Sequence, residues 1–345
     1  MVKQVSVAVV GATGAVGSTM MAQLVKRKFP IKTIKFLASA RSAGKSIEFN
    51  GATYTIEEAT PEAFEGVDVA LFSAGGSVSE KLAPEAAKRG AVVIDNTSHF
   101  RMAEGVPLVV PEVNRHALQQ HKGIIANPNC STIQMVAALA PIREKFGLTS
   151  VVVSTYQAVS GSGIAAIEEL KSQSAEWDKG RDVSASVLPV KSDEKHFPIA
   201  RNVIPQIDVF EDNGFTKEEM KMINETKKIM EMPHLAVAAT CVRVPVVSGH
   251  SESVYIELEK EASKEEIFEA LRLAPGIVLQ DDITAQGYPM PIFAEGEEPV
   301  FVGRIRQDLH NKKGYHLWVV ADNLLKGAAL NSIQIAEAML EDDLL

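Results

Sequence analysis

Cysteine is scarce in this chain, and that scarcity excludes two common ways of stapling a fold. Only Cys130 and Cys241 occur among the 345 residues, and they form no Cys-x-x-Cys pair. The sequence therefore offers neither a disulfide framework nor a zinc ribbon. A chain of this length buries a core large enough to fold without staples. Two unpaired thiols fit a reducing cytoplasm.

Excess positive charge and long apolar runs are lacking as well. Lys and Arg number 35 against 44 Asp and Glu, which gives a net charge of −9. A surface for nucleic acid or anionic lipid requires a basic face, and no apolar run approaches the roughly 18 residues that cross a bilayer. The run Val5–Val10 leads straight into a glycine turn, so we predict a buried strand there rather than a signal peptide. We expect a cytoplasmic protein that binds neither nucleic acid nor membrane.

The first third of the chain alternates short apolar strands with helices, a pattern typical of parallel βαβ units and a doubly wound sheet. After about residue 150 the strands become longer and we expect an α+β region with a mostly antiparallel sheet. An irregular loop is expected near 178–214. The predicted fold class is thus α/β, with a Rossmann-like domain formed by residues 1–127 and the C-terminal helix 323–345. Residues 128–322 are expected to form a second, α+β domain.

A glycine-rich segment follows the first predicted strand and opens a helix. Glycine there permits a tight turn and lets the backbone approach a pyrophosphate, while the helix N-terminus supplies free N–H groups. Both sides of the segment have the context that dinucleotide binding requires. The expected contacts come from Gly11, Thr13, Gly14, Ala15, Val16 and Gly17.

The turn after the second predicted strand indicates which dinucleotide. NAD enzymes usually place an acidic residue there, but this turn carries Arg41 and Ser42 instead. A basic, hydroxyl-bearing turn suits a 2′-phosphate, so NADP is the expected cofactor; a solvated loop arginine is the alternative. Short-chain dehydrogenase chemistry needs Tyr followed four positions later by Lys, and none of the five tyrosines has this partner.

Cys130 is the candidate nucleophile. Pro128 disfavours helix at Asn127, and an apolar helical run follows, so the helix is predicted to begin close to the cysteine. A thiolate is stabilised at such a position by the helix dipole and the free N–H groups. Cys241, in a predicted strand, is expected to be a buried hydrophobe. A thiolate nucleophile needs an acid/base partner, and His250, in a predicted loop of small residues between two strands, is the candidate.

Five segments together resemble the aspartate-semialdehyde dehydrogenase family over almost the whole chain. They are Gly-Ala-Thr-Gly-Ala-Val-Gly (11–17), Pro-Asn-Cys-Ser-Thr (128–132), Tyr-Gln-Ala-Val-Ser-Gly-Ser-Gly (156–163), Arg-Val-Pro-Val-Val-Ser-Gly-His (243–250) and Asp-Asn-Leu-Leu-Lys-Gly-Ala-Ala (322–329).

The resemblance implies a role for each matching position. Cys130 would form the acyl-enzyme, His250 would be the acid/base, and Gln157 would orient the substrate. Arg243 would clamp the substrate carboxylate, a task suited to a bidentate guanidinium; a salt bridge at a strand edge is the alternative for this arginine. Ser160, Gly161 and Asn323 would contact the cofactor.

Three further positions would hold the rest of the substrate. The resemblance makes Arg101 and Lys221 phosphate ligands and Glu218 the contact for the substrate amine. Glu218 and Lys221 also stand three apart, next to a capping box formed by Thr216 and Glu219. Pairing on a solvated helix face is therefore the alternative for these two residues.

The implied reaction is the NADPH-dependent conversion of L-4-aspartyl phosphate to L-aspartate 4-semialdehyde and phosphate by a homo-oligomer, through a Cys130 thioester. The resemblance also implies that residues 128–322 are the catalytic and dimerisation domain. The nearest alternative is N-acetyl-γ-glutamyl-phosphate reductase. That family typically has Pro-Gly-Cys-Tyr around its nucleophile, whereas Asn129 and Ser131 flank Cys130 here. Glyceraldehyde-3-phosphate dehydrogenase, whose family typically has Ser-Cys-Thr-Thr-Asn around its nucleophile, fits this sequence less well. A non-catalytic NADP-binding homologue is the alternative from another class.

Overall fold

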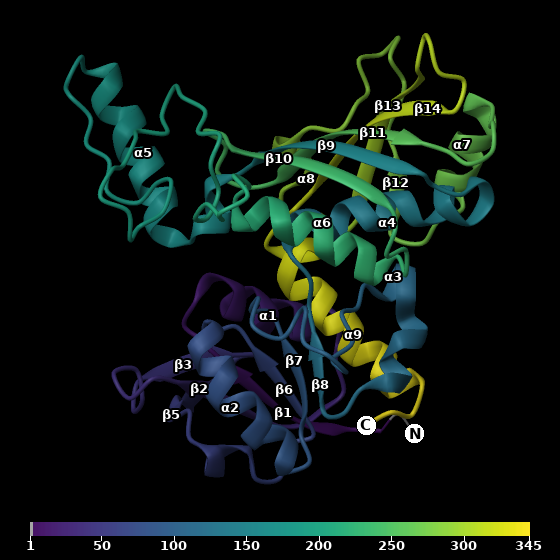
Figure 1. The fold of residues 1–345 in the computed structure, drawn as a ribbon. Helices are drawn as coiled ribbons and strands as arrows, with labels where there is room; N and C mark the ends of the chain where they lie inside the picture. The colour runs from purple at the N-terminus through teal and green to yellow at the C-terminus, as the bar shows by residue number, and fades with distance from the viewer. Residues whose placement is uncertain (1–2) are drawn as a thin grey trace. The chain divides into compact units, whose positions relative to one another are not determined.

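The computed structural model describes residues 3–345 and divides them into two compact units. Unit 1 is formed by Met1–Asn129 and Ala328–Leu345, and unit 2 by Cys130–Gly327. The chain thus leaves unit 1 just before the candidate nucleophile and returns to it for the last helix. Figure 1 shows both units with their helices and strands labelled.

A six-stranded sheet forms the centre of unit 1, and all its neighbouring strands are parallel. The strand order is β5-β2-β1-β6-β7-β8. Counted along the chain without the separate β3–β4 pair, this is the order 3-2-1-4-5-6 of a doubly wound dinucleotide-binding fold. The predicted Rossmann-like fold is confirmed. The strands are β1 (Val5–Val10), β2 (Ile31–Ala38), β5 (Glu57–Glu58), β6 (Val69–Phe72), β7 (Val92–Asp95) and β8 (Ile124–Ala126).

Helices cover both faces of this sheet. Strands such as Val69–Phe72 are therefore buried on both sides. The helices α1 (Ala15–Lys26) and α9 (Leu330–Glu341) pack against each other over one core cluster. The helix α2 (Gly76–Lys88) lies over the other. The predicted C-terminal helix therefore does join the first unit, although it begins at Leu330, after a short π-helical turn, Leu325–Ala329.

A hairpin in unit 1 was missing from the sequence-based prediction. The strands β3 (Ser46–Phe49) and β4 (Ala52–Thr55) pair antiparallel around Asn50 and Gly51, which have φ of 49° and 77°. An Asn-Gly pair in which both residues have positive φ is the preferred two-residue hairpin turn. The hairpin places two aromatic rings against Phe36 of β2, with ring centroids 5.3 and 5.4 Å away.

Unit 2 is built on a second six-stranded sheet, in the order β10-β9-β11-β14-β13-β12. The three central pairings are antiparallel, as predicted, and the pairing at each edge is parallel. The strands are β9 (Ser150–Gln157), β10 (Ala236–Arg243), β11 (His250–Glu257), β12 (Ile277–Leu279), β13 (Val300–Gln307) and β14 (Gly314–Ala321). Neither β12 nor β13 was predicted.

One face of the unit 2 sheet is covered by α4 (Cys130–Phe146), α6 (Lys217–Ile229) and α7 (Lys264–Arg272) (Figure 1). Along β9 every second residue is buried and the others are exposed or half-buried, which is the period of a sheet with one covered face. The helix α4 is buried almost all round. Its apolar sequence is therefore explained by this central position.

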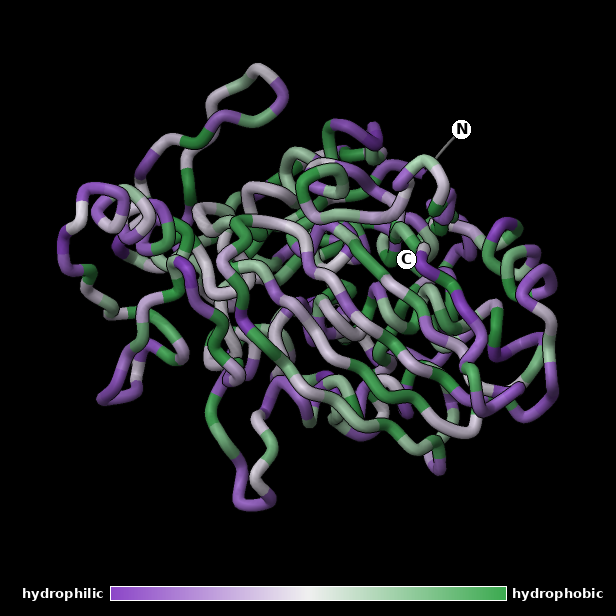
Figure 2. The backbone as a smooth tube through the Cα atoms, turned by 90° about the horizontal axis from the view of Figure 1, so that it is seen from above, coloured by the Kyte–Doolittle hydropathy of each residue, from purple (hydrophilic) through white to green (hydrophobic). Residues whose placement is uncertain are grey.

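The remaining helix, α5 (Ile164–Asp178), leads into an irregular segment that continues to the start of α6. The predicted extended loop near 178–214 is confirmed. Short turns complete the chain: α3 (Pro111–Asn114), α8 (Pro291–Ala294) and the 3-10 turns Pro61–Phe64, Arg115–Gln120 and Val159–Ser162. Figure 2 shows hydrophilic segments at the tips of outlying loops and hydrophobic segments recurring through the body of the chain.

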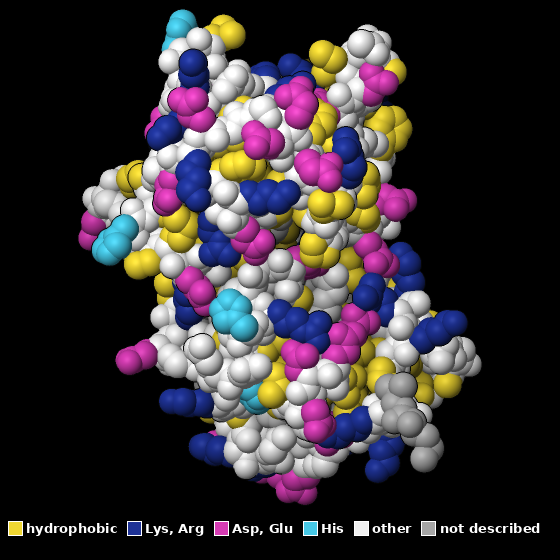
Figure 3. All heavy atoms as spheres, turned by 90° about the vertical axis from the view of Figure 1, so that its right-hand side faces the viewer, with side chains coloured by type: hydrophobic (Ala, Val, Ile, Leu, Met, Phe, Trp, Pro, Cys, Tyr) yellow, Lys and Arg dark blue, Asp and Glu magenta, His cyan; other side chains and the backbone are white. Residues whose placement is uncertain are grey.

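Charges of both signs are interspersed on the face drawn in Figure 3, as expected for a chain without a basic excess. Within residues 3–345, no helix is both long and apolar enough to cross a bilayer.

The start of α6 yields a first test. Thr216 and Glu219 form the predicted capping box, and Thr216 is fully buried. An equivalent box, Ser263 with Glu266, opens α7 at the surface. Thr216→Ala leaves a buried N–H without its acceptor, so we expect a loss of about 1–2 kcal/mol in the free energy of unfolding. Ser263→Ala, whose N–H groups reach water, should cost less.

Urea unfolding of the two variants and of Thr216→Ser makes the comparison. The serine variant keeps the hydroxyl and should stay near the native value. Equal losses at the two helices would show that burial of the first box contributes nothing.

Candidate active site

Cys130 is the first residue of α4, as its position after Asn127-Pro128 predicts. The turn containing Gly327 crosses directly over it. A Cβ atom on Gly327 would lie 2.8 Å from Cys130 Cβ and 3.2 Å from its Cα. Real carbon atoms do not approach so closely, so glycine at 327 is required for the backbone to pass. The cysteine is half-buried and reduced, which fits a thiol held in place but within reach of a small molecule.

Arg243 and His250 lie at the same end of the unit 2 sheet, on either side of β9. The strand β10 ends at the arginine, and β11 begins at the histidine. Both side chains are buried. The turn at Gly161 lies against them: a Cβ there would be 3.0 Å from Arg243 Nη1 and 3.4 Å from His250 Nε2. The prediction that His250 lies in a loop is wrong, because pairing with β14 extends the strand to it. The loop of small residues ends one position earlier.

Arg243 is held by the backbone. Its Nη1 donates to the carbonyl of Ala158 at 2.7 Å, and the described residues form no ion pair with it. The alternative of a salt bridge at a strand edge is therefore not what the structure shows. Burial lowers the pKa of Arg243, while the charges of Glu218 and Cys130 raise it. The guanidinium thus acts electrostatically on the candidate nucleophile.

His250 is a neutral imidazole with a defined tautomer. Complete burial, together with the positive charge of Arg243, lowers its pKa to about 3, against a smaller opposing effect of Glu218. The backbone N–H of Ala158 donates to Nδ1 at 3.0 Å. Because Nδ1 accepts this bond, the ring proton is assigned to Nε2. His250 therefore presents a hydrogen-bond donor to the site.

The side chains of α4 connect the cysteine to this histidine. Gln134 lies one helical turn after Cys130, and its Nε2 approaches the backbone carbonyl of His250 at 3.4 Å. The start of α4 and the start of β11 are thus neighbours within unit 2. Residues 130 and 250 belong to one site region rather than to separate parts of the unit.

Gln157, at the end of β9, begins a chain of polar contacts. Its Oε1 accepts from Thr155 Oγ1 at 3.0 Å, and its Nε2 donates to Glu218 Oε1 at 3.1 Å. Lys221 Nζ then lies 3.2 Å from Glu218 Oε2 and 2.8 Å from Asp208 Oδ2. Glu218 and Lys221 do pair, but not on a solvated face, because Glu218 is buried and contacts Gln157.

Asn323 links two of the predicted site loops. Its Oδ1 accepts from the backbone N–H of Gly249 at 2.9 Å, and its Nδ2 donates to Ser160 Oγ at 2.9 Å. Asn323 and Ser160 are both buried. In unit 2 the asparagine therefore fixes the turn before His250 to the turn that contains Gly161.

The glycine segment of unit 1 has the geometry that its sequence predicts. Gly11 follows β1 with φ +87° and donates its N–H to the carbonyl of Leu37 at 2.8 Å. A Cβ on Gly17 would lie 2.2 Å from the carbonyl oxygen of Gly11. The segment lies where the strand order reverses between β1 and β6, which is where such sheets bind ligands. Thr13 is exposed, and Ala15 and Val16 begin α1.

Arg41 and Ser42 occupy the turn after β2, as predicted. Arg41 is exposed, and the backbone N–H of Ser42 donates to the carbonyl of Ser39 at 2.8 Å. Two acidic residues, Glu57 and Glu58, pair with the end of β2 from the neighbouring strand. They come from a separate element, so the turn itself keeps its basic, hydroxyl-bearing character.

Arg101 is a buried arginine of unit 1. Its Nε donates to the carbonyl of Asn127 and its Nη2 to the carbonyl of Asn96, both at 2.9 Å. The side chain of Asn127 in turn contacts Asn96 and Asn331. The guanidinium is thus fixed to the segment that leads to Cys130.

Four residues of the unit 2 site were not predicted. Gly327 could have been found, because it stands in the segment 322–329 that carries the resemblance. Thr155, Asp208 and Gln134 carry no sequence signal, since only strand pairing and helix packing bring them to the site.

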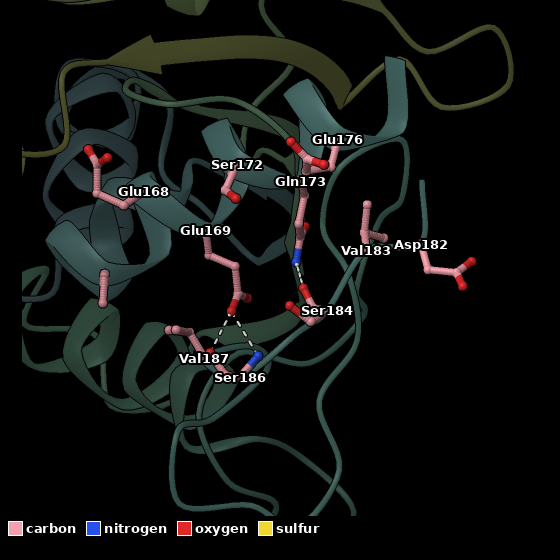
Figure 4. Close-up of a pocket in the computed structure, with 11 residues that line it drawn as sticks. Glu168, Glu169, Ser172, Gln173, Glu176, Asp182, Val183, Ser184, Ser186 and Val187 are labelled. Carbon is pink, nitrogen blue, oxygen red and sulfur yellow. Dashed lines mark hydrogen bonds between the residues drawn. The ribbon is translucent and has the colours of Figure 1, made fainter. Parts of the chain in front are cut away.

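Cys241 is fully buried, and burial raises the pKa of its thiol, which confirms its prediction as a core residue. A separate hollow lies between α5 and the irregular segment, with Glu169 accepting from Ser186 and Gln173 donating to Ser184 (Figure 4). None of the predicted site residues lines it.

Comparison with known proteins agrees with this division of the chain. Residues 6–121 match the family model for the NAD binding domain of semialdehyde dehydrogenase, and residues 139–326 match that for the semialdehyde dehydrogenase dimerisation domain. The fold and site are therefore those of a semialdehyde dehydrogenase.

Individual relatives narrow the family further. The aspartate-semialdehyde dehydrogenase of Bacillus subtilis (strain 168) is 63% identical over 96% of both chains. The crystal structure of aspartate semialdehyde dehydrogenase II from Vibrio cholerae complexed with ASA is 47% identical over 99% of both chains, with a TM-score of 0.93. That of aspartate semialdehyde dehydrogenase with NADP from Candida albicans is 25% identical over 99% of this chain and 100% of that one, with a TM-score of 0.77. The chain belongs to the aspartate-semialdehyde dehydrogenase family.

The contact between Gly327 and Cys130 predicts a sensitive position. A methyl group at 327 must displace either the turn or the start of α4 by several tenths of an ångström. Misplacement of a reacting group by about 1 Å costs on the order of 100-fold in rate. The displacement here is smaller, so we expect Gly327→Ala to lower kcat by about 10-fold. The control is Gly287→Ala, where the new Cβ would approach only to 3.4 Å, and a kcat equal in both variants would contradict the steric argument.

The lowered pKa of His250 predicts how stability depends on pH. In the unfolded chain the imidazole has its ordinary pKa of 6.5, so between pH 6.5 and about 3 the unfolded state binds more protons. Stability from this group is therefore lost as the pH falls. His250→Asn removes the titration and keeps an acceptor for the Ala158 N–H.

We expect the native protein to lose on the order of 2 kcal/mol relative to His250→Asn between pH 8 and pH 5. Urea unfolding at both pH values measures the difference. Parallel changes in the two proteins would show that His250 is not held neutral.

Proposed function

We propose that this chain catalyses the NADPH-dependent reductive dephosphorylation of L-4-aspartyl phosphate to L-aspartate 4-semialdehyde, with Cys130 as the covalent nucleophile. This step belongs to the biosynthesis of lysine, threonine and methionine. One observation carries the assignment of roles: the cysteine at the start of α4 shares its site with a buried arginine and a neutral histidine, in a chain of the aspartate-semialdehyde dehydrogenase family.

The first step is attack of the Cys130 thiolate on the acyl carbon. The start of α4 directs backbone N–H groups towards this position, and Arg243 contributes positive charge. A carbon–sulfur bond forms and the bond to the phosphate oxygen breaks, so that inorganic phosphate leaves with the bonding electrons. A covalent thioester divides one difficult reaction into two easier ones.

Arg243 and Glu218 are suited to hold the amino-acid end of the substrate. The guanidinium of Arg243 is oriented by the carbonyl of Ala158, which leaves a planar fork of donors that suits a carboxylate. Glu218 is an acceptor for an ammonium group, and its pairing with Lys221 and Gln157 keeps it in one position. Binding both charged groups of the substrate would place its acyl carbon.

Phosphate binding is proposed for Arg101 and Lys221. Arg101 is fixed by two backbone carbonyls, which suits a rigid anion contact. Lys221 stands between two carboxylates, Asp208 and Glu218. Its role towards phosphate therefore requires that the anion compete with these partners.

NADP is the proposed cofactor, bound by the glycine segment, with Ser160, Gly161 and Asn323 as further contacts. The close approach of Gly17 to Gly11 leaves the start of α1 open to a pyrophosphate, and Arg41 with Ser42 suits a 2′-phosphate. When bound, NADPH supplies the hydride that reduces the thioester. Asn323 holds the two unit 2 turns in register for this contact.

His250 is the proposed donor that stabilises the oxyanion formed during reduction of the thioester. Reduction of the thioester produces a tetrahedral oxyanion on the carbon bound to Cys130. The Nε2–H of the neutral imidazole is the donor available to this oxyanion, and the bond from Ala158 to Nδ1 maintains that tautomer. Collapse of the oxyanion breaks the carbon–sulfur bond, releasing the aldehyde and returning the thiolate.

We further propose that unit 1 is the cofactor domain, that unit 2 is the catalytic and dimerisation domain, and that the enzyme is a cytoplasmic homo-oligomer. On the face of the unit 2 sheet opposite α4, α6 and α7, the described part of the chain leaves apolar side chains exposed. Val152 and Tyr156 on β9 are 48% and 39% exposed there, and the Tyr156 ring lies 5.5 Å from that of Trp318. An apolar, aromatic sheet face of this kind suits a second copy of the chain.

The assay runs the reaction backwards. We expect reduction of NADP by L-aspartate 4-semialdehyde to require inorganic phosphate, and NAD to serve less well. Cys130→Ala should lower kcat by at least about 10³-fold. Cys241→Ala, which removes a buried thiol outside the reaction, should stay within about threefold of native.

In the forward direction, L-4-aspartyl phosphate should be reduced and N-acetyl-γ-glutamyl phosphate should not. Native turnover by Cys130→Ala would exclude the thioester. Preference for the acetylated substrate would assign the chain to the other reductase.

A further inference from the structure

Two rows of polar side chains cross the covered face of the unit 2 sheet, one directly beneath the other. The upper row contains the proposed reacting groups Arg243, Gln157 and His250. In the row two residues away, Cys241 pairs in register with Thr155, and Thr155 with Glu252. The proposed mechanism uses nothing from this lower row, although Thr155 already donates to Gln157.

Glu252 is the unexpected member of the lower row. Its side chain is fully buried between the sheet and α4. Burial raises the pKa of the carboxyl well above its ordinary value, and the side chain of Gln134 opposes this only in part. A fully buried carboxyl without a cationic partner in hydrogen-bond range favours its neutral form, and a protonated carboxyl is a hydrogen-bond donor as well as an acceptor.

Gln134 lies between this carboxyl and the proposed site. Its Nε2 approaches the backbone carbonyl of His250 at 3.4 Å. Among the described residues, its Oε1 and both carboxyl oxygens of Glu252 lie outside hydrogen-bond geometry with any partner. Unsatisfied buried polar atoms are costly. The side chain of Gln134 lies within interaction range of the Glu252 carboxyl, and a carboxyl O–H is the donor that Gln134 Oε1 lacks.

We propose that Glu252 and Gln134 form a positioning pair for His250. The neutral carboxyl of Glu252 donates to Gln134 Oε1, and Gln134 Nε2 donates to the carbonyl of His250. These two hydrogen bonds link Glu252, the third residue of β11, through Gln134 of α4 to His250, the first residue of the strand. It ties the helix that carries Cys130 to the histidine that serves the oxyanion.

The effect of this pair falls on the chemical step. Within residues 3–345, neither side chain hydrogen-bonds to the groups proposed to bind the substrate carboxylate or amine. Loss of the pair releases the start of β11, so that the Nε2–H of His250 is no longer held against the developing oxyanion. Such a change lowers kcat and leaves KM nearly unchanged. The inference rests on the proposed function, because kcat has meaning only for an active enzyme.

The test compares two substitutions of nearly equal size. Glu252→Gln remains neutral and keeps a donor and an acceptor, so we expect kcat and KM within about twofold of native. Glu252→Leu keeps the volume and removes the donor, so we expect kcat to fall about 10-fold, with KM for semialdehyde and phosphate within about twofold. Gln134→Leu should behave like Glu252→Leu.

The double variant Gln134→Leu with Glu252→Leu separates a linked pair from two independent contributions. If the two residues act in one chain, its kcat equals that of either single variant rather than the product of the two losses. Rates are expressed per folded molecule, counted by mass spectrometry as one in which Cys130 reacts with a thiol reagent and the buried Cys241 does not. Partial unfolding therefore does not imitate a loss of kcat.

Three results would overturn the proposal: a native kcat in Glu252→Leu, a Glu252→Gln variant as slow as Glu252→Leu, or multiplicative losses in the double variant. Failure of the proposed function is a different outcome. In that case the native enzyme itself does not reduce NADP with L-aspartate 4-semialdehyde and phosphate.

Discussion

The passage of one glycine over one cysteine sets the geometry of unit 2. Gly327 crosses so close to Cys130 that no side chain fits between them. The turn that follows β14 is thereby held against the start of α4. The same β14 pairs with β11, which begins at His250. The backbone positions of the nucleophile and the histidine are therefore both fixed by elements that adjoin β14.

Electrostatics in this region depend on burial. Arg243 keeps its charge in the interior because the Ala158 carbonyl and the nearby Glu218 stabilise it. The same positive charge helps to keep His250 neutral. One buried cation thus favours a thiolate at Cys130 and disfavours an imidazolium at His250. This is the protonation pattern that acyl capture followed by oxyanion stabilisation requires.

The backbone of Ala158 has a double function in this arrangement. Its carbonyl accepts from Arg243 and its N–H donates to His250 Nδ1. The backbone of one residue therefore orients the proposed substrate clamp and selects the tautomer of the proposed hydrogen-bond donor to the oxyanion. Neither hydrogen bond uses the side chain of residue 158, so the presence of alanine there does not indicate these roles in the sequence.

Local patterns were sufficient for much of the fold. Alternating apolar strands and helices predicted the parallel sheet of unit 1, and the capping box at Thr216 predicted the start of α6. The β3–β4 hairpin was also visible in principle, through Asn50-Gly51. The strands β12 and β13 were not, because β12 has only three residues and a register shift between Gly303 and Arg306 interrupts the pairing of β13 with β14.

By itself, the sequence determined which chemical groups are present and where turns and helix starts allow them. The glycine segment, the cysteine before an apolar helix and the histidine after a glycine are local features. Only the tertiary structure decided how these groups interact. Whether Glu218 is solvated or buried against Gln157, and where the proton of His250 resides, depend on contacts between residues 61 to 92 positions apart. Protonation and orientation follow from burial, and burial is a property of the packed chain.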